Sequence, residues 1–134
     1  MRIGYLRQEV ADICEWPVYF CNDATAACGA ELVLVCVGED ELDGVLSQLS
    51  GMPHVGLVQN ELLPSRWQEH GITSPTVCVV WFEKKPGRDV HVVRPSGVYG
   101  PQSGLLLSAL SALELAAYEI PEQDLVYELV LKNL

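Results

Sequence analysis

Two short polar segments follow predicted strands, and they hold the residues whose types suit chemistry best. One segment follows the apolar run at 32–37 and the other follows the run at 54–58. In an open parallel sheet, ligands bind beyond the carboxyl ends of the strands, so both segments belong to one edge. The candidate cofactor-binding residues are Gly38, Glu39 and Gln59, and the candidate catalytic residue is Asn60.

Asn60 has two interpretations. Its amide can donate and accept hydrogen bonds, which suits orienting a substrate or a cofactor hydroxyl. An asparagine after a strand is also a common turn or N-cap residue, with no role in catalysis.

Several catalytic motifs are missing from the sequence. The first predicted strand, Met1–Leu6, is followed by Arg7–Asp12 without a glycine, and no G-x-G-x-x-G or G-x-x-x-x-G-K-[ST] motif occurs. Backbone amides that could cradle a pyrophosphate are therefore not predicted. The histidines His54, His70 and His91 have no metal-ligand spacing, and no G-x-S-x-G elbow is present. We expect neither a metal site nor a nucleophile–base pair.

The spacing of the cysteines and the length of the apolar runs indicate in which cellular compartment the protein occurs. The five cysteines include no C-x-x-C pair, and Cys36 and Cys78 lie inside apolar runs, which is typical of reduced structural thiols. Met1–Leu6 is too short for the apolar core of a signal peptide. The longest apolar stretch, 105–120, carries two glutamates. We therefore expect a cytoplasmic protein that does not span a membrane.

Charge is unevenly distributed along the chain. The net charge is −10, which argues against binding to nucleic acid or to an anionic membrane surface. Half of the eight lysines and arginines lie close together, at Lys84, Lys85, Arg88 and Arg94. This segment could form a patch for phosphate or for an acidic partner. The interpretation we favour is a charged hairpin that protects a sheet edge from aggregation.

Hydrophobic periodicity predicts one α/β domain over residues 1–134. The predicted strands are Met1–Leu6, Val18–Cys21, Leu32–Val37, His54–Val58, Thr76–Phe82 and Val90–Val93. The predicted helices start at Glu39 and near Pro64, and two more run over Ser103–Glu119 and Glu122–Asn133, with a Pro/Gly loop at 95–101 before them. The fold class expected is a Rossmann-like three-layer domain with a mostly parallel sheet, an antiparallel hairpin at one edge and C-terminal helices over about 103–134.

The order of these elements resembles a known family. The stretch 30–101 is similar to the second half of the nucleotide-binding domain of ketopantoate reductases (2-dehydropantoate 2-reductases). The matching pieces are Glu31–Val37 with the helix after it, Val58–Asn60, Val79–Phe82 and Val90–Val93. In addition, Tyr127–Leu134 resembles the helix that opens the family's second, all-helical domain.

The resemblance implies an NADP site with Asn60 at a matching active-site position, but the sequence departs from the family at several points. The glycine loop has no counterpart. Gly38 stands where the family has a lysine, and Leu129 stands at the position of its catalytic lysine, with Lys132 one turn later. The resemblance therefore implies a shortened, non-catalytic relative, with no cofactor, that acts through ligand binding or protein interaction.

Two alternatives remain open at this point. One is an NADP-dependent 2-dehydropantoate reductase-like oxidoreductase in which a partner chain or an unusual loop supplies the missing groups. The other is an acidic regulatory or scaffold subunit that takes no small ligand.

Shortening of the family's second domain would leave apolar side chains of the last helices uncovered. These side chains are Leu125, Leu129, Val130 and the cluster at 105–107. Exposed apolar patches of this kind usually mark association, so we expect a homodimer through the C-terminal helices.

Overall fold

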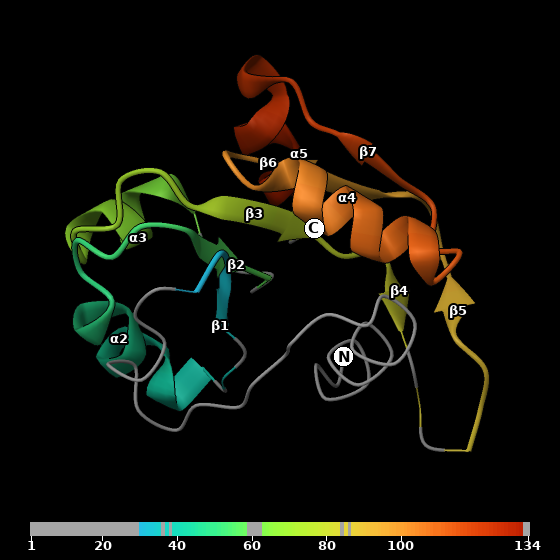
Figure 1. The fold of residues 1–134 in the computed structure, drawn as a ribbon, viewed down its shortest axis with the longest axis horizontal. Helices are drawn as coiled ribbons and strands as arrows, with labels where there is room; N and C mark the ends of the chain where they lie inside the picture. Colours follow the sequence, from blue (N-terminus) through green and yellow to red (C-terminus); the bar gives the residue numbers. More distant parts are fainter. Residues whose placement is uncertain are drawn as a thin grey trace.

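The fold is a layered α/β domain, seen in a computed structural model that describes residues 30–35, 37, 39–58, 63–83, 85 and 87–132 (Figure 1). The strands are β1 (Val33–Val35), β2 (Val55–Leu57), β3 (Thr76–Val79), β4 (Phe82–Glu83), β5 (His91–Val92), β6 (Ser96–Tyr99) and β7 (Ala117–Glu119). The helices are α2 (Glu39–Gln48), α3 (Pro64–Glu69), α4 (Ser103–Ala112), the 3₁₀ helix η2 (Glu122–Asp124) and α5 (Leu125–Lys132). The predicted strands Met1–Leu6 and Val18–Cys21 lie outside the described residues.

The described part of the chain forms one five-stranded sheet in the order β1-β2-β3-β6-β7 and a separate two-stranded sheet of β4 and β5. Strands β1, β2 and β3 are parallel, with Val33 opposite Val55 and Gly56 opposite Thr76. Strand β6 is antiparallel to β3 and parallel to β7. The carboxyl ends of β1, β2 and β3 therefore lie at one edge, and those of β6 and β7 lie at the opposite edge.

Side chains alternate between the two faces of the sheet and build a core on each. On β3, Val77 and Val79 face the core formed with α2, α3 and α5, whereas Cys78 faces the core formed with α4. Each core is made of fully buried aliphatic side chains such as Leu46 on the first face and Leu110 on the second. This arrangement confirms the predicted three-layer α/β class.

The first half of the described chain follows the sequence prediction. Leu42 and Leu46 on α2 are buried, as is Leu49 directly after the helix, and the chain then turns through Gly51 at φ 74°. As predicted, α3 begins at Pro64, and Trp67 is buried on the inner face of that helix.

The second half corrects two predictions. The run 76–82 breaks after Val79, so the predicted hairpin forms as the small β4–β5 sheet and is not part of the main sheet. The antiparallel neighbour of β3 is β6, which was predicted as a loop. Its residues Ser96, Gly97 and Val98 are all buried between β3 and β7.

The predicted helix over 103–119 ends at Ala112, and its last residues form β7. The Leu115 N–H donates to the Leu110 carbonyl oxygen at 2.8 Å, while Glu114 adopts φ 58°. This is a Schellman-type helix end, in which the left-handed position usually holds glycine. Because Glu114 occupies that position, the sequence carries no stop signal there.

The C-terminal helix forms as predicted, but its apolar side chains are not all uncovered. Leu125 and Leu129 are buried against the described sheet, so the expectation that they are exposed is wrong. In the other predicted cluster, at 105–107, Leu106 of α4 is buried in the second core. Val130 does stay exposed, as expected.

Candidate functional site

Trp81 lies just beyond β3, at the edge where the parallel strands β1, β2 and β3 end. Its backbone is held on both sides, because its N–H donates to Ser96 Oγ at 3.0 Å and its carbonyl accepts from the Val93 N–H at 2.9 Å. These two bonds fix the backbone of Trp81, whose side chain packs against the core on the α5 face of the sheet. This edge is the one at which ligands bind in open α/β sheets.

Two cationic side chains converge on the Trp81 indole. Lys132 Nζ lies 4.2 Å from the centroid of the ring, and Arg94 Cζ lies 5.2 Å from it. Both distances fall within the range of cation–π attraction. Burial lowers the pKa of the Lys132 ammonium. No ion pair with a carboxylate of the described residues involves either side chain.

A tyrosine–glutamate pair belongs to the same face of the sheet. The Tyr118 hydroxyl on β7 donates to Glu128 Oε1 at 2.7 Å, and Glu128 precedes Lys132 by one turn on α5. Burial, with a further effect of the Glu128 hydrogen bond, raises the pKa of Tyr118 to about 12. The phenol therefore stays protonated at neutral pH and acts as a donor.

Two buried polar atoms in these elements have no hydrogen-bond partner: Trp81 Nε1 and Glu128 Oε2. An unpaired buried donor or acceptor costs about 1–3 kcal/mol, so such atoms are uncommon in stable cores. The carboxyl edge thus combines two cations, one unpaired donor and one unpaired acceptor. We call Trp81, Arg94, Tyr118, Glu128 and Lys132 the edge cluster.

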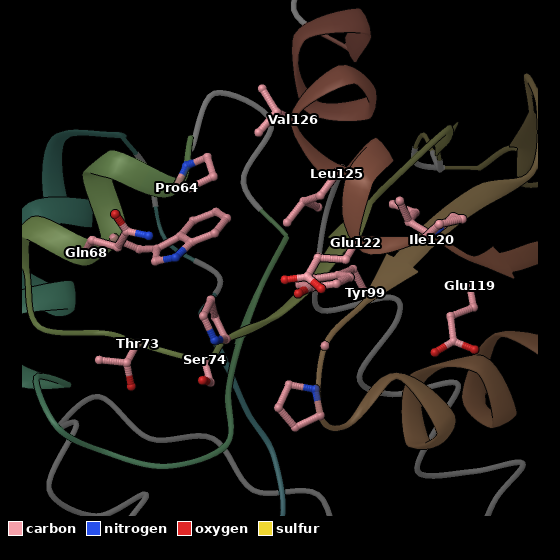
Figure 2. Close-up of a pocket in the computed structure, with 15 residues that line it drawn as sticks. Pro64, Gln68, Thr73, Ser74, Tyr99, Glu119, Ile120, Glu122, Leu125 and Val126 are labelled. Atoms are coloured by element: carbon pink, nitrogen blue, oxygen red, sulfur yellow. The ribbon is translucent and has the colours of Figure 1, made fainter.

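A groove of about 730 Å³ lies at the opposite edge, between α3 and α5 (Figure 2). Trp67 and Pro64 form its wall on α3, and Leu125 and Val126 form its wall on α5. The remaining lining residues are Gln68, Thr73, Ser74, Pro75, Tyr99, Gly100, Pro101, Glu119, Ile120, Pro121 and Glu122. The described lining contains two carboxylates and no lysine, arginine or histidine.

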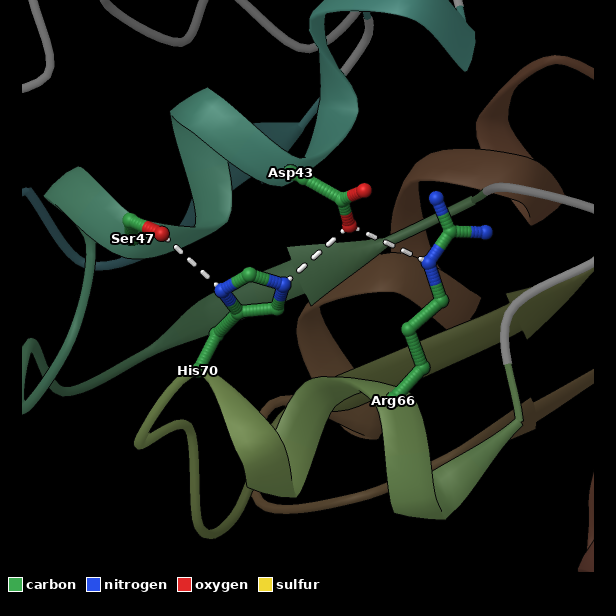
Figure 3. Close-up of polar contacts among 4 residues, drawn as sticks. All are labelled: Asp43, Ser47, Arg66 and His70. Atoms are coloured by element: carbon green, nitrogen blue, oxygen red, sulfur yellow. Dashed lines mark hydrogen bonds and ion pairs between the residues drawn. The ribbon is translucent and has the colours of Figure 1, made fainter.

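Asp43, Ser47, Arg66 and His70 form a hydrogen-bonded array between α2 and the end of α3 (Figure 3). His70 Nε2 lies 3.1 Å from Asp43 Oδ1, and His70 Nδ1 lies 2.9 Å from Ser47 Oγ. Arg66 Nε donates to the same Asp43 oxygen at 3.3 Å.

Although this array contains a serine, a histidine and an aspartate, its setting differs from that of a hydrolase site. Ser47 lies within α2 rather than on a strained turn, and it lines no part of the groove. Asp43 is 65% exposed to solvent. The array therefore joins two helices at the surface, which is a structural role.

The structure describes only some of the candidate residues that the sequence predicts. Gly38, Gln59 and Asn60 lie outside the described residues, and Glu39 is the first residue of α2. Cys78 is a buried free thiol whose pKa burial raises to about 12, as expected of an inert cysteine.

Three members of the edge cluster, Trp81, Tyr118 and Glu128, were not predicted from the sequence. The spacing of Glu128 and Lys132 on one helix face was an available signal. Tyr118 was not identified as a site residue because the sequence predicts a helix over 103–119, whereas the structure has Tyr118 on β7. Arg94 was assigned to the charged hairpin, and the structure places it over Trp81 instead.

Two absences hold for the described ranges. Among the residues that the structure describes, no group of three or more histidine, cysteine, aspartate or glutamate side chains could hold a metal ion. Within the same ranges, no helix combines the length and the apolar character that crossing a bilayer requires.

Comparison with known proteins gives no relative from which a role could be transferred. No family model, curated protein or solved structure matches the chain. The chemistry of the edge cluster and of the groove therefore carries the functional argument.

Proposed function

We propose that this chain is a non-catalytic Rossmann-like protein, related to ketopantoate reductases, that binds a small organic anion at the carboxyl edge of its sheet. The observation that carries the proposal is the convergence of Arg94 and Lys132 on Trp81 without a carboxylate partner among the described residues. A carboxylate or phosphate group of the ligand would lie between these cations.

The charges favour an anion at this position. Two like charges close to one ring repel each other, and partial burial makes Lys132 more costly to keep protonated. A bound anion would offset both effects. Arginine suits carboxylate and phosphate oxygens because its planar guanidinium presents paired donors, while lysine contributes a point charge.

The same edge fits a pyrophosphate-bearing cofactor poorly. A dinucleotide phosphate would bind at the start of α2, where Asp40 and Glu41 are exposed carboxylates. The chain also has no glycine-rich loop. These features support the non-catalytic proposal over the NADP-dependent alternative.

The test is a ligand titration followed on the indole N–H resonance of Trp81, assigned by comparison with Trp81→Phe. Inorganic phosphate and malonate are the probes, and NADPH is the third arm. We expect phosphate or malonate to shift this resonance, and we expect Arg94→Gln and Lys132→Met each to weaken binding about tenfold, the loss expected for one charged hydrogen bond. The matched control is Lys85→Gln, which removes an exposed lysine of the hairpin.

Three outcomes decide between the proposals. Absence of any shift with phosphate and malonate contradicts the anion site. Equal weakening by Lys85→Gln contradicts a specific site, because it indicates general charge attraction. Tighter binding of NADPH than of phosphate supports the reductase alternative.

We also propose, as a separate point, that copies of this chain associate through a surface that includes α5. Support comes from Val126, Tyr127 and Val130, which are exposed on this helix. Contiguous apolar side chains at a surface usually mark an interface.

A further inference from the structure

The large apolar side chains that stay exposed in the described chain form two patches. The groove patch consists of Val126, Tyr127 and Val130 on α5, together with Leu63 directly before α3. Of these four residues, Val126 lines the groove between α3 and α5. The hairpin patch consists of Val92 and Val93, at the end of β5. Tyr127 is 66% exposed and Val93 is 63% exposed, so each patch includes one aliphatic or aromatic residue with most of its surface in contact with solvent.

The two patches carry opposite charge. Beside the groove patch, Glu119 and Glu122 line the groove, and the lining has no basic residue in the described chain. Beside the hairpin patch, Lys85 and Arg88 are exposed on the turn between β4 and β5. The segment from 83 to 94 holds four basic and two acidic residues, so its formal charge is +2 in a chain whose net charge is −10. Lys85 Nζ lies 3.8 Å from one of these acids, Glu83.

The hairpin of one molecule does not reach the groove of the same molecule. The groove lies at the amino end of β3, beside Ser74 and Pro75, whereas β4 follows the carboxyl end of β3. Figure 1 shows β4 and β5 projecting away from α3 and α5. An occupant with the chemistry of the hairpin must therefore come from another molecule.

We propose that the β4–β5 hairpin of one copy docks in the α3–α5 groove of a second copy. Val92 and Val93 would pack against the groove patch, and Lys85 and Arg88 would face Glu119 and Glu122. The inference rests on the self-association proposed above and adds the surface that α5 contacts. Two reciprocal contacts of this kind close a symmetric pair and leave neither patch exposed.

Charge reversal with rescue tests this contact in the full chain. One variant carries Glu119→Lys and Glu122→Lys, and the other carries Lys85→Glu and Arg88→Glu. We expect sedimentation velocity to show self-association of the wild-type chain, and each variant alone to associate more than about tenfold more weakly, because like charges then face each other. Mixing the two variants restores association, since the reversed charges are complementary again.

The control variant is Glu41→Lys with Glu69→Lys, which makes the same charge change on the exposed surfaces of α2 and α3, outside the groove lining. Circular dichroism checks that each variant is folded, and Val93→Ser tests the apolar half of the contact without a charge change. A monomeric wild-type chain at high concentration overturns both the self-association proposal and the docking. Self-association that survives both charge reversals overturns the docking alone. Neither result bears on the anion titration of the edge cluster.

Discussion

Asp43 Oδ1 lies 3.1 Å from His70 Nε2, although 27 residues separate the two side chains in the sequence. The same oxygen accepts from Arg66, so one carboxylate of α2 holds two side chains of the α3 region (Figure 3). Hydrogen bonds from Arg66 and then from His70 lower the pKa of Asp43 below its ordinary value of 3.8.

The lowered pKa of Asp43 predicts an acid-dependent loss of stability. The unfolded chain binds the proton at a higher pH than the folded chain does, so this contribution is complete well above pH 3.8 and is lost as the pH falls through the folded pKa. In urea unfolding at a series of pH values, the free energy of unfolding should fall less between neutral and acidic pH for Asp43→Asn than for the wild type. Asp40→Asn, an exposed change on the same helix, is the control. Identical acid profiles for the wild type and Asp43→Asn would contradict the prediction.

Removal of the Tyr118 hydroxyl should destabilise the fold. Tyr118→Phe leaves Glu128 Oε1 without its 2.7 Å donor, in addition to Oε2, which already has no partner. We expect the free energy of unfolding to fall by about 1–3 kcal/mol. A double-mutant cycle with Glu128→Ala, which removes the acceptor, measures the coupling between the two side chains, and additive losses would show that the hydrogen bond contributes nothing.

Cys78 should resist alkylation while the protein is folded. Burial raises the pKa of its thiol to about 12, so the reactive thiolate is scarce at pH 8. Mass spectrometry after iodoacetamide treatment should find the peptide with Cys78 unmodified in the native protein and modified in urea. Rapid labelling of Cys78 without denaturant is the contrary result.

Alanine at position 100 should be strongly unfavourable. Gly100 has φ 122°, and a Cβ atom there would lie 2.5 Å from the Pro75 carbonyl oxygen and 2.7 Å from Thr76 Cα. Because the added Cβ atom would clash with backbone atoms, we expect Gly100→Ala to lower the free energy of unfolding by about 3 kcal/mol. Gly44→Ala is the matched control, because nothing lies within 4 Å of its added Cβ in α2. In thermal unfolding experiments, the free energy of unfolding of Gly44→Ala should exceed that of the wild type by up to about 1 kcal/mol.

Glycine at position 114 should stabilise the end of α4. Glu114 adopts φ 58°, which costs a side-chain-bearing residue about 1–2 kcal/mol. Glu114→Gly removes this strain, and the greater freedom of glycine in the unfolded chain offsets part of the gain. We expect a net increase of up to about 1 kcal/mol in the free energy of unfolding, whereas a decrease would show that the Glu114 side chain stabilises the turn.

Local patterns of residues are enough to specify several elements of this fold. The stripe of Leu42, Leu46 and Leu49 specifies the buried face of α2, and the buried runs specify the parallel strands β1, β2 and β3. The missing glycine loop is likewise a property of the sequence. Such features depend on residues a few positions apart, so periodicity and composition are sufficient to predict them.

The contacts between distant segments, in contrast, depend on how whole elements pack. Strand β7 was assigned to a helix because its apolar residues continue the pattern of α4, and it becomes a strand through pairing with β6, whose Val98 carbonyl accepts from the Ile120 N–H at 2.8 Å. Likewise, Lys132 reaches Trp81 only because α5 packs across the sheet. Contacts between distant segments arise from the packing of whole elements, and no local spacing in the sequence encodes them.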